Sequence, residues 1–301
     1  MSFELNGNVY EFQTKLDGGA QAQLSQYLSD GLLYTVKSTL PFKRSQTYTS
    51  FDMEVKILTQ LRDICKMIRV PCIVDHTVLT RDMPLYHHFN TYRPFKFYPT
   101  DPDIEGREGN PIGIIIYHFI AGVSLSSLVK GDTTRANVNI GTIVQDVLEY
   151  LLYTVRFLHS HNIIHQDIKL ANIIRNVDTG KLTLIDFGLA KIAPYLPMDL
   201  FGTINHIWPD ILKQGHGSSS DYMISDVYAI GVCCYRLCNN NSVPFDIEVN
   251  EDNIPHTYTM YPYEGDGDLT LLPPKLKDTI RMLLLEPQRG LDAIIDYWEQ
   301  S

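Results

Sequence analysis

Long hydrophobic runs are missing from this chain of 301 residues. The longest apolar candidate, residues 112–123, is interrupted by His118 and falls short of the roughly 18 residues that a membrane span needs. Residues 1–4 carry neither the basic start nor the apolar stretch of a secretory signal, and position 2 is not the Gly that myristoylation requires. We therefore expect an intracellular protein without a membrane partner, in the cytoplasm first, with the nucleus left open.

Cysteine is also scarce. The chain has five cysteines, which are Cys65, Cys72, Cys233, Cys234 and Cys238. An odd number without the spacing of a disulfide framework predicts reduced thiols in an intracellular compartment. Cys234 and Cys238 have no matching cluster of His or Cys after them, and they lie in an apolar helical stretch. We therefore interpret them as buried small side chains and not as metal ligands.

Basic residues are not in excess. Lys and Arg total 25 against 35 Asp and Glu, a formal net charge of −10. Residues 1–118 hold 12 basic and 13 acidic side chains, a difference of −1, and residues 119–301 hold 13 and 22, a difference of −9. A nucleic acid is therefore not expected as a partner, because no cationic surplus exists to displace its counterions. The apolar fraction of 44% predicts a folded globule.

Short apolar alternations occupy the start of the chain, and helical periodicity dominates the rest. Strands are expected within residues 10–37, at 72–79 and at 112–117, with one helix at 49–64. The stretch 80–111, which is rich in Pro and Gly, is expected to be a long irregular loop. Further helices are expected at 140–160, 225–238, 276–285 and 291–298.

Two carboxylates, a lysine and an asparagine occur at intervals that suit a particular chemistry. The segment His165–Asn172 reads His-Gln-Asp-Ile-Lys-Leu-Ala-Asn, and Asp186-Phe187-Gly188 begins 19 residues after Asp167. In phosphoryl transfer from a metal–nucleotide complex, one carboxylate orients the attacking hydroxyl and accepts its proton. A second carboxylate, with an amide oxygen, holds Mg²⁺. The two motifs, in this order and at this spacing, resemble the catalytic core of the eukaryotic-type protein kinases.

The resemblance runs from about Leu16 to Trp298 and implies a single protein kinase domain with a two-lobed α+β fold. Residues 1–118 would form a β-rich N-lobe with a nucleotide-covering sheet, one helix and the 80–111 loop. Residues 119–301 would form a helical C-lobe with the catalytic and substrate-docking helices. The compact form and the worn motifs resemble those of virus-encoded or pathogen-encoded members.

By this resemblance, four residues of the two motifs divide the chemistry. Asp167 would orient and deprotonate the acceptor hydroxyl, and Lys169 would neutralise charge on the transferred phosphoryl group. Asn172 and Asp186 would hold Mg²⁺. Lys169 together with Thr203 is typical of the Ser/Thr branch of the family, in which the Thr hydroxyl bonds the catalytic Asp and Lys.

ATP would be held in part by the N-lobe. Lys37, in Tyr-Thr-Val-Lys, would pair with the α- and β-phosphates, and Glu54 would hold the Lys37 ammonium in an ion pair. In the phosphate-covering loop, only the middle glycine of the family pattern, Gly19, is in register. Asp17 replaces the first glycine, and its carboxylate would repel the nucleotide if it pointed inward, which implies weaker binding of ATP. The alternative is an ordinary Gly-Gly hairpin turn.

The linker between the lobes would contact the nucleoside. By resemblance, Tyr117 limits the depth of the adenine pocket, and the backbone of His118 and Ile120 would face the adenine edge. Ser124 would lie near the ribose. These positions follow from the alignment register of the family and not from the chemistry of the side chains.

Two departures from the family pattern lead to further expectations. Gln166 replaces the Arg that usually precedes the catalytic Asp, and it carries no charge to pair with a phosphate. We therefore expect activity without phosphorylation of the segment after the second motif. Trp-Pro-Asp replaces Ala-Pro-Glu, and its Asp210 is expected to pair with Arg289. Asp226 begins a helix that would anchor the catalytic loop.

The residues therefore predict ATP-dependent phosphoryl transfer to Ser or Thr hydroxyls of a protein substrate, with ATP and Mg²⁺ as cofactors. An alternative is a pseudokinase that acts as a scaffold or regulator, which Gln166 and the degraded glycine loop favour. Retention of both lobes' nucleotide and metal residues opposes it, because a pure scaffold has no chemical need for them. A small-molecule kinase is opposed by the peptide-docking resemblance of residues 202–210. The oligomeric state stays open.

Overall fold

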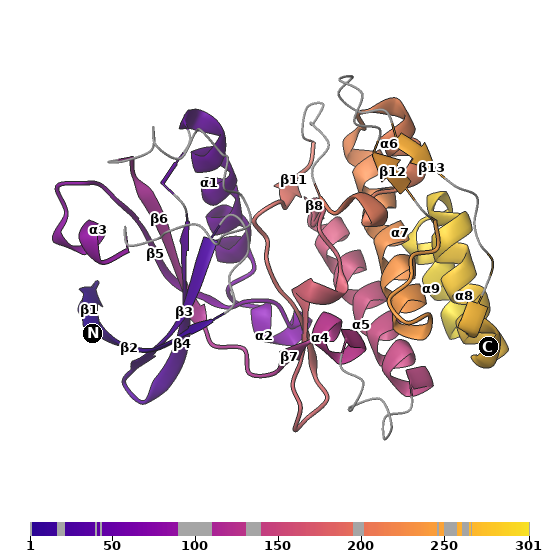
Figure 1. The fold of residues 1–301 in the computed structure, drawn as a ribbon, viewed down its shortest axis with the longest axis horizontal. Helices are drawn as coiled ribbons and strands as arrows, with labels where there is room; N and C mark the ends of the chain where they lie inside the picture. Colours follow the sequence, from indigo (N-terminus) through magenta and orange to yellow (C-terminus); the bar gives the residue numbers. More distant parts are fainter. Residues whose placement is uncertain are drawn as a thin grey trace. The chain divides into compact units, whose positions relative to one another are not determined.

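The computed structural model describes residues 2–16, 22–39, 41–42, 44–89, 110–130, 140–194, 202–245, 247–249, 258–260, 265 and 267–300 (Figure 1). The chain divides into two compact units, Met1–Ile120 and Ala121–Ser301. Strands dominate the first unit and helices dominate the second, so the expected α+β class is confirmed. Among the described residues, no helix combines the length and the apolar character that crossing a membrane would require.

A six-stranded antiparallel sheet builds the first unit, with the strand order β1-β2-β3-β4-β6-β5. The strands are Ser2–Leu5 (β1), Asn8–Leu16 (β2), Ala22–Ser29 (β3), Leu32–Thr39 (β4), Ile73–Leu79 (β5) and Ile112–His118 (β6). β6 pairs with β4 on one side and with β5 on the other, and its isoleucines are fully buried. Successive side chains of a strand point to opposite faces, so both faces of the sheet must be covered at β6.

Helix α1 (Arg44–Gln60) covers one face of the sheet. Its Phe51 lies over the bare backbone of Gly113, where a Cβ atom would come within 2.4 Å of the ring. The helix starts five residues earlier than expected and stops at Gln60, and a short helix α2 (Cys65–Ile68) follows it. The apolar positions that predicted the helix are buried, and they are Phe51, Val55, Leu58 and Leu61.

An aromatic cluster covers the opposite face. Phe3 of β1 stacks on Tyr10 of β2 at 5.0 Å between ring centroids, and it meets Phe89 edge-on at 5.3 Å. Phe89 belongs to helix α3 (Pro84–Phe89), so the expectation of an irregular loop throughout 80–111 is wrong for that part. The remainder of that stretch, residues 90–109, lies outside the described residues. Ile114 and Ile116 lie an odd number of residues from Gly113 on the same strand, so their side chains point to the other face of the sheet, where they belong to the same cluster.

Cys65 and Cys72 form a disulfide, so the expectation of reduced thiols is wrong for this pair. Helix α2 ends at Arg69, whose left-handed backbone (φ 57°) turns the chain back. This turn brings the Cα atoms of the two cysteines to 5.3 Å, a separation that a disulfide can bridge. The remaining three cysteines are buried and are not in disulfides, as expected, and burial raises the pKa of Cys233 to about 12.

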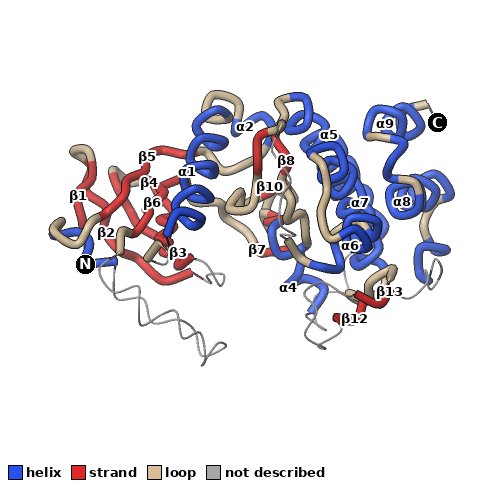
Figure 2. The backbone as a smooth tube through the Cα atoms, turned by 90° about the horizontal axis from the view of Figure 1, so that it is seen from above, coloured by secondary structure: helices blue, strands red, loops and turns tan. Residues whose placement is uncertain are grey.

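Helices form the core of the second unit, and α7 packs against both α5 and α8 (Figures 1 and 2). The helices are Leu125–Lys130 (α4), Ile140–Ser160 (α5), Pro209–Gln214 (α6), Ser219–Cys238 (α7), Pro274–Leu285 (α8) and Leu291–Glu299 (α9). The bounds of α5 are those expected from its periodicity. Its apolar stripe is fully buried and includes Val144, Val147, Leu151, Val155 and Leu158.

Short strand pairs frame the two motifs in the second unit. The pairs join β7 (Val123–Ser124), β9 (Ile173–Arg175) and β10 (Leu182–Leu184) in one sheet, and β8 (Ile163–Ile164) with β11 (Lys191–Ile192) in another. A further pair joins β12 (Ile247–Val249) and β13 (Tyr258–Met260). His165 directly follows β8, and Asp186 lies two residues after β10. Each motif therefore begins where a short strand ends.

Candidate active site

The loop that follows β8 is fixed by a carboxylate on α7. Asp226, which is 2% exposed, accepts the backbone N–H of His165 at 2.8 Å and that of Gln166 at 2.9 Å. His159, on α5, places its Nε2 3.0 Å from the same carboxylate. A buried carboxylate is stable only with such donors. Asp226 therefore anchors the loop to the core helix.

Asp167 lies at the centre of a network of three side-chain donors. Lys169 Nζ lies 2.7 Å from its Oδ2, and Asn172 Nδ2 donates to the same oxygen at 2.9 Å. Thr203 Oγ1 donates to Oδ1 at 2.9 Å and accepts from Lys169 Nζ at 3.2 Å. These donors hold the carboxylate in one orientation. A carboxylate held in this way can accept a proton from a hydroxyl placed against it.

Gly202 allows Thr203 to reach Asp167. Its backbone has φ 122°, a conformation that L side chains rarely adopt. A Cβ atom at this position would lie 2.6 Å from the carbonyl oxygen of Gln166. Only glycine permits the segment that contains Thr203 to lie this close to the catalytic loop.

Asn172 and Asp186 are brought together by the backbone. Asn172 ends the 3₁₀ turn η3 (Leu170–Asn172), and its carbonyl oxygen accepts the N–H of Ile185 at 2.8 Å. Asp186 has a left-handed backbone, with φ 65°. The next residue, Phe187, is fully buried, and its ring lies 4.8 Å from the His165 ring. The two motifs are therefore one structural unit.

The donor chemistry of Asn172 and Asp186 fits Mg²⁺. Asn172 Nδ2 donates to the backbone and the side chain of Asp167, at 2.9 Å each, so Oδ1 is the amide atom that can face a cation. Asp186 adds a carboxylate. Among the described residues there is no cluster of three or more His, Cys, Asp or Glu that could hold a metal. Mg²⁺ commonly keeps several waters and binds phosphate oxygens beside one or two carboxylates, so two protein ligands are enough for it.

In the first unit, Lys37 of β4 and Glu54 of α1 form a two-pronged ion pair. Lys37 Nζ lies 2.8 Å from Oε1 and 3.0 Å from Oε2 of Glu54. The side chains are 12% and 5% exposed, and a charge so buried is stable only beside a partner. The pair holds the ammonium in one position on the α1 side of the sheet.

His118 ends β6, and its ring stacks on Tyr34 with 5.2 Å between the centroids. Burial, with a smaller contribution from Lys66, lowers the pKa of His118, so the imidazole is neutral at pH 7. The backbone N–H of His118 donates to the carbonyl oxygen of Cys72 at 3.2 Å. Any contact of this backbone with an adenine would therefore use the carbonyl group.

The other residues expected near the nucleotide are Ile120, Ser124 and Gly19. Ile120 is the last residue of the first unit. Ser124 precedes α4, and its Oγ accepts the N–H of Ser127 at 3.3 Å and lies 2.9 Å from Ser126 Oγ. Gly19 lies outside the described residues. The roles assigned to all three stay predictions.

The expected ion pair between Asp210 and Arg289 is wrong. Asp210 Oδ1 lies 3.0 Å from the Nζ of Lys213, one turn along α6. Arg289 pairs with Glu286, three residues before it. Both charges find partners within their own turn, a pairing that needs no long-range contact.

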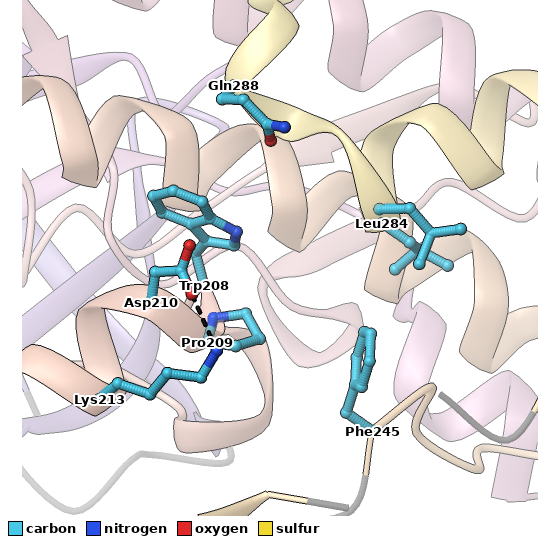
Figure 3. A pocket seen from close by; sticks show the side chains of 8 residues that line it. Trp208, Pro209, Asp210, Lys213, Phe245, Leu284 and Gln288 are labelled. Atoms are coloured by element: carbon cyan, nitrogen blue, oxygen red, sulfur yellow. Dashed lines mark hydrogen bonds and ion pairs between the residues drawn. The ribbon is translucent and has the colours of Figure 1, made fainter. Parts of the chain in front are cut away.

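A cavity of about 370 Å³ lies beside Asp210 (Figure 3). Its lining residues are Trp208, Pro209, Asp210, Lys213, Phe245, Leu284, Leu285 and Gln288. None of them belongs to the network around Asp167. The cavity is therefore not the candidate active site.

His206 and Arg236 make a buried contact that no sequence pattern indicated. His206 is 4% exposed, and its Nε2 lies 3.4 Å from an Nη1 of Arg236, 30 residues further along the chain. Burial, then the positive charges of Arg236 and Lys169, lowers the pKa of His206 to about 3. His206 lies within residues 202–210 but is not one of the residues that carry the resemblance there, and Arg236 belongs to no motif, so the spacing of residue types could not have found the pair.

This histidine should make the protein less stable as the pH falls. The pKa is about 3 in the folded chain and about 6.5 in the unfolded chain, so only the unfolded chain binds this proton between those values. The stability is therefore fully present above the unfolded pKa and decreases as the pH falls below it. Between pH 7 and pH 5 the loss should be about 2 kcal/mol. Urea unfolding at both pH values measures it, and His206→Asn should remove that part of the dependence. An equal pH dependence in the two proteins would contradict a neutral buried imidazole.

Comparisons with known proteins agree on one family. A family model for the protein kinase domain matches residues 108–284, more than half of the chain. The chain is 29% identical over 136 residues to the probable serine/threonine-protein kinase PknB of Lactococcus lactis, a match that covers 44% of this chain and 20% of that protein. It is 25% identical over 229 residues to the putative serine/threonine-protein kinase R436 of Acanthamoeba polyphaga mimivirus, which covers 73% of this chain and 75% of that protein. The chain thus spans one fifth of the length of the bacterial relative.

A solved structure shares the fold over nearly the whole chain. The kinase PK-1 of the Cydia pomonella granulovirus superposes with a TM-score of 0.61, and the match covers 96% of this chain and 93% of that one. The sequence identity is 20%, so this likeness concerns the fold alone.

Proposed function

The chain belongs to the protein kinase domain family, and from that premise we propose that it is an active enzyme that transfers the γ-phosphoryl group of ATP to Ser or Thr hydroxyls of a protein substrate. One observation carries the proposal. The Asp167 carboxylate is held in a single orientation by Thr203, Lys169 and Asn172. A chain that only bound partners would have no chemical use for this arrangement.

Asp167 supplies the proton acceptor of the proposed reaction. The acceptor hydroxyl donates a hydrogen bond to the carboxylate, and its oxygen attacks the γ-phosphorus of ATP. A new phosphorus–oxygen bond forms as the bond to the ADP oxygen breaks, and the hydroxyl proton passes to Asp167. Lys169, whose Nζ lies 2.7 Å from that carboxylate, would neutralise charge on the phosphoryl group during its transfer.

The other residues of the proposal concern the nucleotide and its metal ion. Asn172 Oδ1 and the Asp186 carboxylate would hold Mg²⁺, which when bound neutralises charge on the phosphates. Lys37, oriented by Glu54, would bind the α- and β-phosphates. Contacts of Gly19 with the phosphates, of His118 and Ile120 with the adenine and of Ser124 with the ribose are part of the proposal.

Two further features support a Ser/Thr protein substrate, and a third concerns regulation by phosphorylation. Lys169 and Thr203 are bonded to each other, as expected for the Ser/Thr branch. The net charge of −10 favours a protein over a nucleic acid as the partner. Gln166 is uncharged and buried, so we infer that it is no receptor for a phosphorylated residue. An intracellular, cytoplasmic location remains part of the proposal.

Phosphate transfer to a peptide library tests the proposal. The purified protein is incubated with γ-labelled ATP, Mg²⁺ and libraries whose only hydroxyl is that of Ser, Thr or Tyr, with Asp186→Asn as the blank. We expect label in the Ser and Thr libraries and none above the blank in the Tyr library. Binding of ATP without transfer to any library would instead favour the pseudokinase alternative.

A further inference from the structure

A partly buried cation, Arg236, contacts the turn that follows Thr203. The turn is the 3₁₀ turn η4 (Ile204–His206), and Arg236 belongs to the last turn of α7. Arg236 Nη1 lies 3.4 Å from His206 Nε2, and Arg236 Nε donates to Asn241 Oδ1 at 3.0 Å. Within the described part of the chain, the hydrogen bonds of this guanidinium therefore go to neutral acceptors.

The chemistry of the pair fixes the state of His206. A guanidinium can donate hydrogen bonds but cannot accept them, so His206 Nε2 is the acceptor and the ring carries its proton on Nδ1. The lowered pKa of His206, about 3, agrees with a neutral ring at every working pH. A protonated ring would put two positive charges in contact, so the contact itself requires the neutral form.

The acceptors that the described residues offer to Arg236 are not those that best offset its desolvation. A buried cation costs desolvation free energy, which a carboxylate partner would offset better than a neutral ring and an amide. Burial lowers the pKa of Arg236, which is the sign of that cost. An apolar side chain of similar size at position 236 would avoid it.

Two hydrogen bonds of Thr203 link the backbone of His206 to the network around Asp167. The backbone N–H of His206 donates to the carbonyl oxygen of Thr203 at 2.7 Å. The hydroxyl of the same Thr203 donates to Asp167 Oδ1 at 2.9 Å. On the other side of Thr203, Gly202 lies so close to the backbone of Gln166 that a Cβ atom would not fit between them. Thr203 thus lies between Gly202 and the backbone N–H of His206, and the His206 ring in turn contacts Arg236.

We propose that Arg236 and His206 are positioning residues for phosphoryl transfer, and that they act by holding η4 so that the Thr203 hydroxyl meets Asp167. This inference rests on the proposed function. Neither residue is proposed to contact ATP or the acceptor hydroxyl, so replacing either one should leave the KM for ATP nearly unchanged.

Replacement of Arg236 by Met tests the proposal. We expect kcat for peptide phosphorylation to fall by about 10- to 100-fold, the loss typical of a small displacement at an active site, while the KM for ATP stays within about twofold. His206→Phe keeps the ring volume but removes the acceptor, and it should show the same pattern. Arg236→Lys keeps a donor and should recover part of kcat. Arg156→Met, which removes a guanidinium from an exposed pair with Asp292, is the matched control and should match the wild type.

A double-mutant cycle with Thr203→Val separates positioning from a general structural role. If Arg236 acts through Thr203, Arg236→Met should cost almost nothing further in the Thr203→Val background, because the hydroxyl that it positions is already gone. Full additivity of the two losses would overturn the proposal. A matching rise in the KM for ATP, or a loss of kcat in proportion to a lowered Tm, would overturn it as well.

Hydrogen exchange of the backbone amides gives a readout that does not depend on activity. In Arg236→Met, the amides of His206 and Ile207 should exchange faster, and those of α5 should keep their wild-type rates. If the wild-type protein transferred no phosphate, the proposed function would fail, yet faster exchange in η4 would still support the positioning of Thr203. Unchanged exchange in η4 would overturn the inference whether or not the protein is active.

Discussion

Asp167→Asn should lower kcat for peptide phosphorylation by about a thousandfold and leave the affinity for ATP within a few-fold. In the proposed reaction, the carboxylate accepts the hydroxyl proton only as the acceptor attacks, so its contribution would belong to the transition state and not to ground-state ATP contacts. An Asn side chain keeps the size of Asp and loses the acceptor. Its amide nitrogen would also face donors, either Lys169 Nζ and Asn172 Nδ2 or Thr203 Oγ1.

The measurement is steady-state transfer to the best library peptide, with ATP affinity determined separately by calorimetry. Asp178→Asn, on the exposed turn between β9 and β10, is a matched control that removes one carboxylate outside the network. The control should keep wild-type kcat. If Asp167→Asn weakened ATP binding as much as it slowed transfer, the residue would have a structural role and not the one assigned here.

Asp186→Asn should remove the Mg²⁺ dependence of ATP binding and lower transfer by about a thousandfold, equivalent to about 4 kcal/mol of lost charge stabilisation. The reason is the donor set of the candidate metal site. Asn172 can offer only a neutral carbonyl oxygen, because its amide nitrogen is bonded to Asp167. In the proposed site, Asp186 would then supply the anionic oxygen that a hard cation requires.

Calorimetric titration with ATP, once with Mg²⁺ and once with a chelator, measures the effect. The wild type should bind ATP more tightly with Mg²⁺, whereas Asp186→Asn should give the same affinity under both conditions. Wild-type Mg²⁺ dependence in Asp186→Asn would move the metal site elsewhere. Asp178→Asn again serves as the control for the loss of one negative charge.

Much of the fold was predictable because it depends on local periodicity. The stripe of α5 recurs at threes and fours over five turns, and its bounds were expected from the sequence. Strand β1 and helix α3 escaped prediction because each is short. Phe3 and Phe89 are informative only once they meet in the aromatic cluster. The Cys65–Cys72 disulfide depends on the left-handed turn at Arg69, which no residue count indicates.

The candidate site divides in the same way. Asp167, Lys169, Asn172 and Asp186 could be named because their chemistry lies in two short motifs at a fixed spacing. The Asp210–Arg289 pair failed because each charge had a closer partner in its own turn. His206 and Arg236 could not be named at all. Their contact depends on how η4 packs against the end of α7, which is a property of the fold and not of either segment.

Gln166 and Asp186 have left-handed backbones, at φ 64° and φ 65°, and this conformation lowers the stability of the folded chain at two positions of the candidate site. A side chain in this conformation costs on the order of 1 kcal/mol that glycine would not. A selection for heat resistance alone would therefore favour Gly at position 186. Such a selection would enrich chains that fold better and lack the carboxylate proposed to hold Mg²⁺. Any stabilised version of this protein should be selected for turnover and heat resistance together, because at Asp186 the two demands conflict.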